Sequence, residues 1–152
     1  MSIDKASYQS ELLQAMISCN NSAIQNINNA LTHWPAKATG IGFDTFIDQD
    51  EEGFVSILLT PQGPDSYVLN KQVRDFRYLF DIKFIDGQLN FPVTLFDPNE
   101  AFFDMREAVS ETALKWVLSL IKQIGEVEFP KPIIFSNCYH EAKILHDACE
   151  SN

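Results

Sequence analysis

The feature that most constrains the fold of this chain is one long amphipathic helix, predicted from Asp104 to Ile124. Asp104 and Glu107 form an N-terminal capping pattern, and Gly125 fits the position at which a helix stops. Apolar residues recur between these ends at helical spacing, and they form a wide stripe. We therefore expect other elements to cover this helix on more than one side. The stripe comprises Val109, Ala113, Leu114, Trp116, Val117, Leu118, Leu120, Ile121 and Ile124.

The N-terminal part of the chain predicts two shorter helices. Ser22 and Gln25 form a capping box that predicts the start of the second helix, and Pro35 predicts its end. Two short helices this close in sequence are expected to pack as an antiparallel pair. The apolar face of the first helix comprises Tyr8, Leu12, Ala15, Met16 and Cys19.

The periodicity then changes from 3.6 to 2, which indicates strands. Residues 41–47 alternate between apolar and polar or small side chains, and residues 54–60 return as a more apolar strand. The acidic stretch 49–53 between them reads as a hairpin loop, in which Gly53 can adopt a positive φ angle. A second hairpin is predicted at Asp86-Gly87, because Asp-Gly between alternating residues is a strong signal for a two-residue turn.

The C-terminal region predicts a return to the sheet and then a short helix. Residues 126–129 are expected to form a short strand. Pro130 and Pro132 restrict residues 133–135 to an edge strand or a loop. A closing helix is predicted from residues that recur at helical spacing, namely Cys138, Ala142, Leu145 and Cys149.

These elements predict a single α+β domain over residues 1–152. It would contain an N-terminal helical pair, an antiparallel sheet of four or five strands, the helix 104–124 packed on that sheet, and a short C-terminal helix. The first residues lack a signal-peptide pattern, and no apolar run approaches the roughly 20 residues that span a bilayer. The expected location is the cytoplasm, where the three cysteines would be reduced thiols.

Charge gives the main indication of function. There are 21 acids against 11 bases, for a formal net charge of -10. Such a surface repels nucleic acid and anionic membrane, and it favours a basic partner. The acids form two groups, with aromatic residues beside them that could anchor a partner. The predicted partner-binding residues are Asp48, Asp50, Glu51, Glu52 and Phe54 in the first group, and Asp97, Glu100, Asp104, Glu107 and Glu111 in the second.

Each acidic group also has a simpler interpretation. Either group can be an ordinary solvated surface, because acids are common at exposed turns and helix starts. The first group begins like a calcium loop at Asp48, but the twelfth position is Leu59 instead of a bidentate glutamate. A solvated hairpin tip is therefore favoured over a calcium site.

A second possible site is a run of metal-ligand residue types near the C-terminus. Its spacing matches no common structural zinc site, and buried thiols with surface histidines are the simpler interpretation. The sequence has no nucleotide-binding glycine pattern and no nucleophile motif, so we expect neither a cofactor nor catalysis. The run comprises Cys138, His140, His146 and Cys149.

Three stretches prompt a comparison with known proteins. Residues 48–56, 63–70 and 95–98 resemble a small bacterial domain family that is similar in style to the immunity proteins of toxin–immunity pairs. Such proteins are short, acidic, cytoplasmic α+β domains that bind and block one toxin. The resemblance covers about residues 40–120. Its motifs are turns and strand edges, so it implies a fold more than a function, and it assigns no site residues.

Charge and resemblance together predict an immunity or inhibitor protein of a contact-dependent growth inhibition system. It would occlude the active site of a basic toxin domain, with a nuclease as the favoured activity. The alternative is a small-ligand or metal-dependent module, which includes an enzyme, that uses carboxylates or the Cys138, His140, His146 and Cys149 cluster. The sequence does not indicate an oligomeric state.

Overall fold

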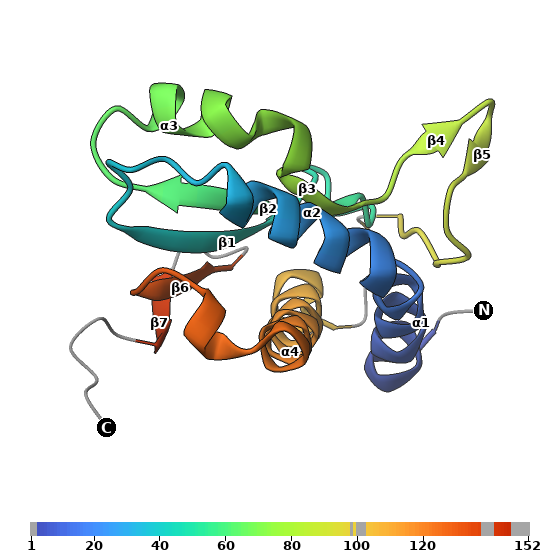
Figure 1. Cartoon of the computed structure of the whole chain (residues 1–152). Helices are drawn as coiled ribbons and strands as arrows, with labels where there is room; N and C mark the ends of the chain where they lie inside the picture. Colours follow the sequence, from blue (N-terminus) through green and yellow to red (C-terminus); the bar gives the residue numbers. More distant parts are fainter. Residues whose placement is uncertain (1–2, 98, 100–102, 138–141, 147–152) are drawn as a thin grey trace.

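The computed structural model describes residues 3–97, 99, 103–137 and 142–146. Within these ranges the chain forms helices α1 to α4, a five-stranded sheet and a separate two-stranded hairpin. In Figure 1, α2 crosses in front of the sheet, α4 lies below β1, and α3 lies above β2. The expected α+β class, with two N-terminal helices and a long helix packed on the sheet, is confirmed.

The main sheet has the strand order β3-β2-β1-β6-β7. All neighbours are antiparallel except β1 and β6, which run parallel from the pair Ile41–Ile133 to the pair Asp44–Ser136. The expectation of an antiparallel sheet was therefore wrong for this one pair, and the sheet is mixed. Its strands are β1 (Gly40–Ile47), β2 (Val55–Gln62), β3 (Tyr78–Asp81), β6 (Ile133–Ser136) and β7 (Ala142–His146).

The predicted edge position of residues 133–135 was also wrong, because β6 lies inside the sheet between β1 and β7. Both prolines precede the strand, so their missing N–H groups remove no hydrogen bond from within it. Pro132 contributes its carbonyl oxygen instead, which accepts from the Ile41 backbone N–H at 3.0 Å. The expected strand at 126–129 is a 3₁₀ turn, η3 (Glu126–Glu128).

The predicted C-terminal helix is instead strand β7 over its described part. Ile134 of β6 lies opposite Ile144 of β7, and Ser136 lies opposite Ala142. The open edge of β6 supplies hydrogen-bond partners to this segment, and this cross-strand pairing overrides the weak helical spacing. The helical prediction also used Cys138 and Cys149, which lie outside the described residues.

The N-terminal pair is α1 (Lys5–Ile17) and α2 (Asn20–Thr32). The Asp4 carboxylate caps α1 by accepting from the Ser7 backbone N–H at 2.8 Å. Helix α2 begins two residues before the predicted Ser22, and its predicted end before Pro35 is confirmed. Four of the five residues predicted for the apolar face of α1 are buried in it, namely Tyr8, Leu12, Ala15 and Met16. The fifth, Cys19, follows the end of the helix and is half-buried.

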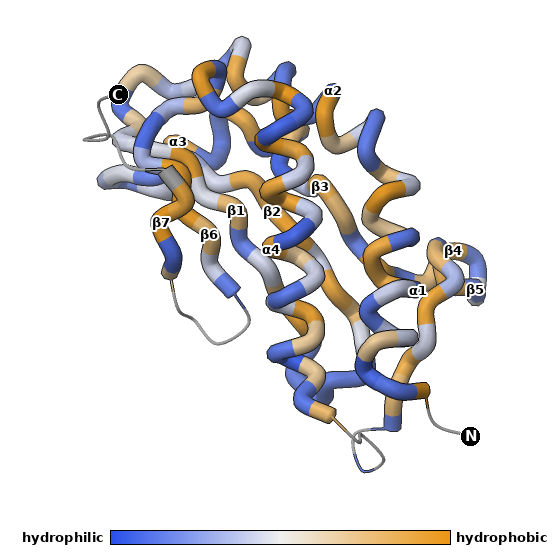
Figure 2. The backbone as a smooth tube through the Cα atoms, turned by 90° about the horizontal axis from the view of Figure 1, so that it is seen from below, coloured by the Kyte–Doolittle hydropathy of each residue, from blue (hydrophilic) through white to orange (hydrophobic). Residues whose placement is uncertain are grey.

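Helix α4 (Met105–Ile124) confirms the prediction within one residue, with Asp104 as its N-cap and Gly125 as its C-cap. It packs against α1 on one side and the sheet on another, as its wide apolar stripe predicted (Figure 2). Trp116 is fully buried in this layer and donates its indole N–H to Asn20 at 2.6 Å.

The remaining elements follow β2 in the chain. Helix α3 (Ser66–Val73) and the 3₁₀ turn η1 (Arg74–Phe76) pack beside β2 and α2, and they lead back into β3. The predicted Asp86-Gly87 hairpin is confirmed as β4 (Phe84–Ile85) and β5 (Gln88–Leu89).

Candidate partner-binding surface

The loop between β1 and β2 is organised by one carboxylate. Asp48 accepts from the backbone N–H groups of Gly53 and Phe54 through Oδ1, at 3.0 and 2.9 Å, and from that of Glu52 through Oδ2 at 3.0 Å. Glu51 and Gly53 adopt positive φ angles of 55° and 120°, which lets the loop close on this side chain. Asp48 therefore fixes the backbone of the loop, and its role as a partner contact stays a prediction.

The same loop is joined to the start of α4. The Arg106 guanidinium donates from Nε to Glu51 Oε1 at 2.8 Å, and the two side chains are only partly exposed. A second link comes from the segment before α4, where the Phe96 backbone N–H donates to the Glu52 carbonyl at 2.7 Å. These links bring the two acidic groups together, although they are separated by about fifty residues in the sequence.

The acids on α4 are partly neutralised by α1. Lys5 forms ion pairs with Glu107 and with Glu111, the latter at 3.4 Å. Gln9 donates to the Glu111 carboxylate at 3.0 Å. The Gln9 hydrogen bond, with help from Lys5, lowers the pKa of Glu111 below its ordinary value, and the bond to Glu107 raises the pKa of Lys5. Asp104 caps α4 through the Glu107 backbone N–H at 3.1 Å.

The remaining predicted residues differ in how they are held. Asp97 is exposed and accepts from the Asn99 backbone N–H at 2.9 Å, and Glu100 lies outside the described residues. Asp50 is exposed and Glu52 is half-buried. Within the part of the chain that the structure describes, neither carboxylate accepts a hydrogen bond or forms an ion pair.

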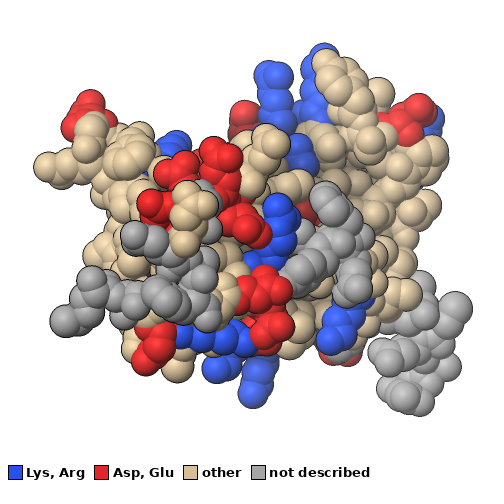
Figure 3. All heavy atoms as spheres, turned by 180° about the vertical axis from the view of Figure 1, so that it is seen from behind, with Lys and Arg blue, Asp and Glu red and all other residues tan. Residues whose placement is uncertain are grey.

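We call the joined set the acidic surface. It runs from the β1–β2 loop to the second turn of α4, and its acids outnumber Lys5 and Arg106, the bases that pair with them. Figure 3, which views the molecule from behind, shows Asp and Glu side chains gathered with Lys and Arg side chains between them. Its described acids are Asp48, Asp50, Glu51, Glu52, Asp97, Asp104, Glu107 and Glu111.

Phe54 links the acidic surface to apolar residues that the sequence interpretation missed. Its half-buried ring lies 5.6 Å from the ring of Phe84, between centroids. Phe84 and Ile85 are 56% and 51% exposed on the β4–β5 hairpin. The alternation around Asp86-Gly87 predicted this hairpin. The sequence does not show whether another element covers its apolar side chains, so their exposure was not predicted.

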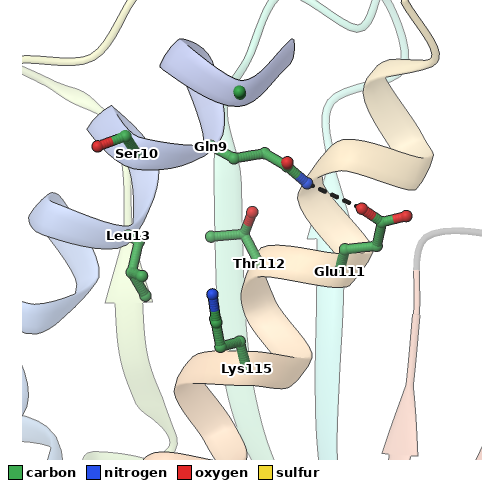
Figure 4. A pocket seen from close by; sticks show the side chains of 7 residues that line it. Gln9, Ser10, Leu13, Glu111, Thr112 and Lys115 are labelled. Atoms are coloured by element: carbon green, nitrogen blue, oxygen red, sulfur yellow. Dashed lines mark hydrogen bonds between the residues drawn. The ribbon is translucent and has the colours of Figure 1, made fainter.

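A shallow groove between α1 and α4 adjoins the acidic surface and has a volume of about 480 Å³. Figure 4 shows Gln9 reaching across it from α1 toward Glu111 on α4, with Thr112 and Lys115 along the α4 side. With Ser10, these side chains give the groove a polar rim beside the acidic surface.

The side chains of the alternative metal cluster lie outside the part of the chain that the structure describes. Across ranges 3–97, 99, 103–137 and 142–146, no three metal-ligating side chains lie close enough to hold an ion. Cys138, His140 and Cys149 lie outside these ranges, and only the backbone of His146 is described. The remaining cysteine, Cys19, is a free thiol whose pKa is raised by burial, which disfavours the reactive thiolate.

A family model described as "Family of unknown function (DUF6389)" matches residues 3–141. The chain belongs to this family. No curated protein and no solved structure matches it. The family description names no activity, so the resemblance to immunity proteins stays a prediction. None of the helices in the described ranges combines the length and the apolar character needed to cross a membrane.

Proposed function

We propose that this DUF6389 protein is an immunity or inhibitor protein that binds a basic toxin domain and occludes its active site. The favoured target is a nuclease, because a nuclease holds its substrate phosphates in a basic cleft. The proposal places the protein in the cytoplasm of a bacterium that is exposed to contact-dependent growth inhibition. It assigns the protein a binding role and no catalytic residue.

The observation that carries the proposal is the Glu51–Arg106 ion pair, which merges two acidic groups into one surface. Isolated acids at a turn or a helix start need no functional explanation. Here, however, acids from distant segments are joined into one surface through Arg106. Two of them, Glu107 and Glu111, are four residues apart on one helix, a spacing at which like charges destabilise a helix by a few tenths of a kcal/mol. A cationic partner would relieve that repulsion.

The physical mechanism would be electrostatic steering followed by occlusion. An acidic surface attracts a basic cleft at long range and increases the association rate, an effect that salt weakens. Asp50 and Glu52 are the acids best placed to act in this way, because their carboxylates are not engaged by other described groups. Asp48 and Asp104 would instead maintain the shape of the surface.

The test is a co-purification with the product of the adjacent upstream gene, scored across a salt series. We expect one-to-one capture that weakens as salt rises, together with loss of that product's toxicity. The double substitution Asp50→Lys with Glu52→Lys, which reverses both charges, should lower the association rate by more than about tenfold at low salt. The matched control is Glu126→Lys with Glu128→Lys, which reverses two exposed acids in η3, at the far end of α4.

Two results would contradict the proposal. Failure to capture the neighbouring product at any salt concentration would remove the inhibitor function. Equal loss of association in the control pair would show that total charge, and not the acidic surface, is responsible.

A further inference from the structure

The β4–β5 hairpin projects from the body of the molecule (Figure 1), and the contact between Phe84 and Phe54 places its base beside the β1–β2 loop. Its base is tied to β2, because the Ile82 backbone N–H donates to the Val55 carbonyl at 2.9 Å and Ile82 is buried. Its outer part carries the exposed apolar residues Phe84 and Ile85, and its turn carries Asp86. Phe84 rests on Phe54 on one side, and the exposed parts of Phe84 and Ile85 contribute little to folding and are available to a partner.

The hairpin is held in a defined shape. The Asn90 side chain donates to the Asp81 carbonyl at 2.7 Å and accepts from the Lys83 backbone N–H at 3.0 Å, which clamps the two arms together. Asp86 and Gly87 have φ angles of 52° and 80°, as a tight two-residue turn requires. A preformed element loses little conformational entropy when a partner binds it.

The two apolar side chains lie on opposite faces of the hairpin. Phe84 pairs with Leu89 across the strands, and Ile85 pairs with Gln88. Successive strand residues point to opposite sides, so a flat partner could bury only one of them. A partner that buries both must surround the tip, which means that it must present a cleft.

The charge near the tip indicates what kind of cleft fits. Asp86 is exposed at the turn, and its carboxylate has no partner among the described residues, whereas the exposed Lys83 at the base of the hairpin forms an ion pair with Asp81 at 3.9 Å. Phe54, in contact with Phe84, connects the hairpin to the acidic surface. A second copy of this chain would bring two strongly acidic molecules together, and an anionic lipid surface would be repelled.

We propose that the β4–β5 hairpin inserts into the substrate cleft of a basic protein partner. In this arrangement Asp86 occupies the position of a substrate phosphate against the partner's basic side chains. Ile85 packs on one wall of the cleft, and the exposed part of Phe84, whose ring stays against Phe54, packs on the other. The inference rests on the proposed inhibitor function for the identity of the partner, and it adds the element that enters the active site.

Binding kinetics with the product of the adjacent upstream gene test the inference. Contacts at the centre of an interface act mainly on dissociation, and long-range charge acts mainly on association. We expect Phe84→Ser with Ile85→Ser to increase the dissociation rate by more than about tenfold and to change the association rate by less than about threefold. The matched control is Tyr67→Ser with Val68→Ser, an adjacent exposed apolar pair on α3.

A second variant tests whether the acid at the turn of the hairpin contributes to inhibition. Asp86→Lys should weaken inhibition of the partner by more than about tenfold, and Asp75→Lys, an exposed acid in η1, should leave inhibition unchanged. If the hairpin fills the cleft, a short substrate analogue should compete with the wild-type protein for the partner. Circular dichroism and thermal melts of every variant confirm that the fold is retained.

The outcomes separate the two proposals. If the wild-type protein binds and the hairpin variants bind equally well without competition by substrate, the insertion inference is overturned and the inhibitor function stands. If the wild-type protein captures nothing, the inhibitor function is overturned, and the inference falls with it.

Discussion

The β1–β2 loop and the β4–β5 hairpin turn the chain at the same end of the molecule, yet they use their acids differently. In the first, Asp48 points inward and accepts three backbone hydrogen bonds, and Glu51 is tied to Arg106. In the second, the amide of Asn90 holds the arms together, and the acid at the turn, Asp86, is left exposed. The role of an acid therefore depends on which donors its carboxylate accepts from, and not on its position in an acidic run.

The largest effect is expected for Asp48→Ala. This change removes a charged acceptor from three backbone N–H groups, so we expect the free energy of unfolding to fall by about 3 kcal/mol, as measured by urea denaturation. Asp86→Ala is the matched control in the other turn and should change stability by less than about 0.5 kcal/mol. Similar losses in the two variants would show that the two acids do not differ in role.

A smaller effect is expected for Asn90→Ala, which removes the clamp of the projecting hairpin. We expect a loss of about 1–2 kcal/mol and faster hydrogen exchange at the Lys83 amide, which donates to the Asn90 side chain. Gln88→Ala, an exposed change in the same hairpin, provides the control. Unchanged exchange at Lys83 would mean that the hairpin is held by other contacts.

The ion pair between Glu51 and Arg106 should contribute less still. Its two side chains are 40% and 32% exposed, and pairs of this kind are screened by water. A double-mutant cycle with Glu51→Gln and Arg106→Gln should give a coupling energy of about 0.5 kcal/mol. A coupling near zero would indicate that the backbone bond from Phe96 to Glu52 joins the two acidic groups without help from the ion pair.

The smallest effect concerns pH. The pKa of Glu111 is lower in the folded protein than its ordinary value, mainly because Gln9 donates to the carboxylate. Its stabilising contribution is therefore present above the ordinary glutamate pKa of about 4.3 and is lost as the pH falls through the lower folded value. NMR titration of Gln9→Ala should show the pKa of Glu111 moving back toward the ordinary value. A pKa that does not move would assign the shift to Lys5.

Local signals were sufficient for most elements of the fold. Helix α4 was predicted within one residue because its cap, apolar stripe and terminal glycine all indicate the same boundaries. Both turns were predicted from residues that tolerate positive φ angles, namely Gly53 and Asp86-Gly87. These features depend on neighbours in the chain, so the sequence alone contains the information.

The region from Glu126 to His146 could not be predicted in the same way. Strand β6 is internal because β1, which comes much earlier in the chain, pairs with one of its edges and β7 pairs with the other. Pro130 and Pro132 indicate an edge only if they fall inside the strand, and here they precede it. Pairing between distant segments decided this region.

The candidate site was predicted as two separate groups of acids. The sequence shows Arg106 among the acids of the second group, but it does not show that the partner of Arg106 is Glu51 in the first. It also does not show that Phe84 and Ile85 stay exposed, because an alternating apolar pattern usually indicates burial.

The parallel pairing of β1 with β6 has a consequence for synthesis of the protein. Ile41 and its neighbours are translated long before Ile133, so one edge of β1 has no partner strand while most of the chain emerges from the ribosome. An unpaired strand edge is a template for association with other chains. We therefore expect a product truncated before Ile133 to aggregate. The newly made chain should also depend on molecular chaperones until β6 has left the ribosome.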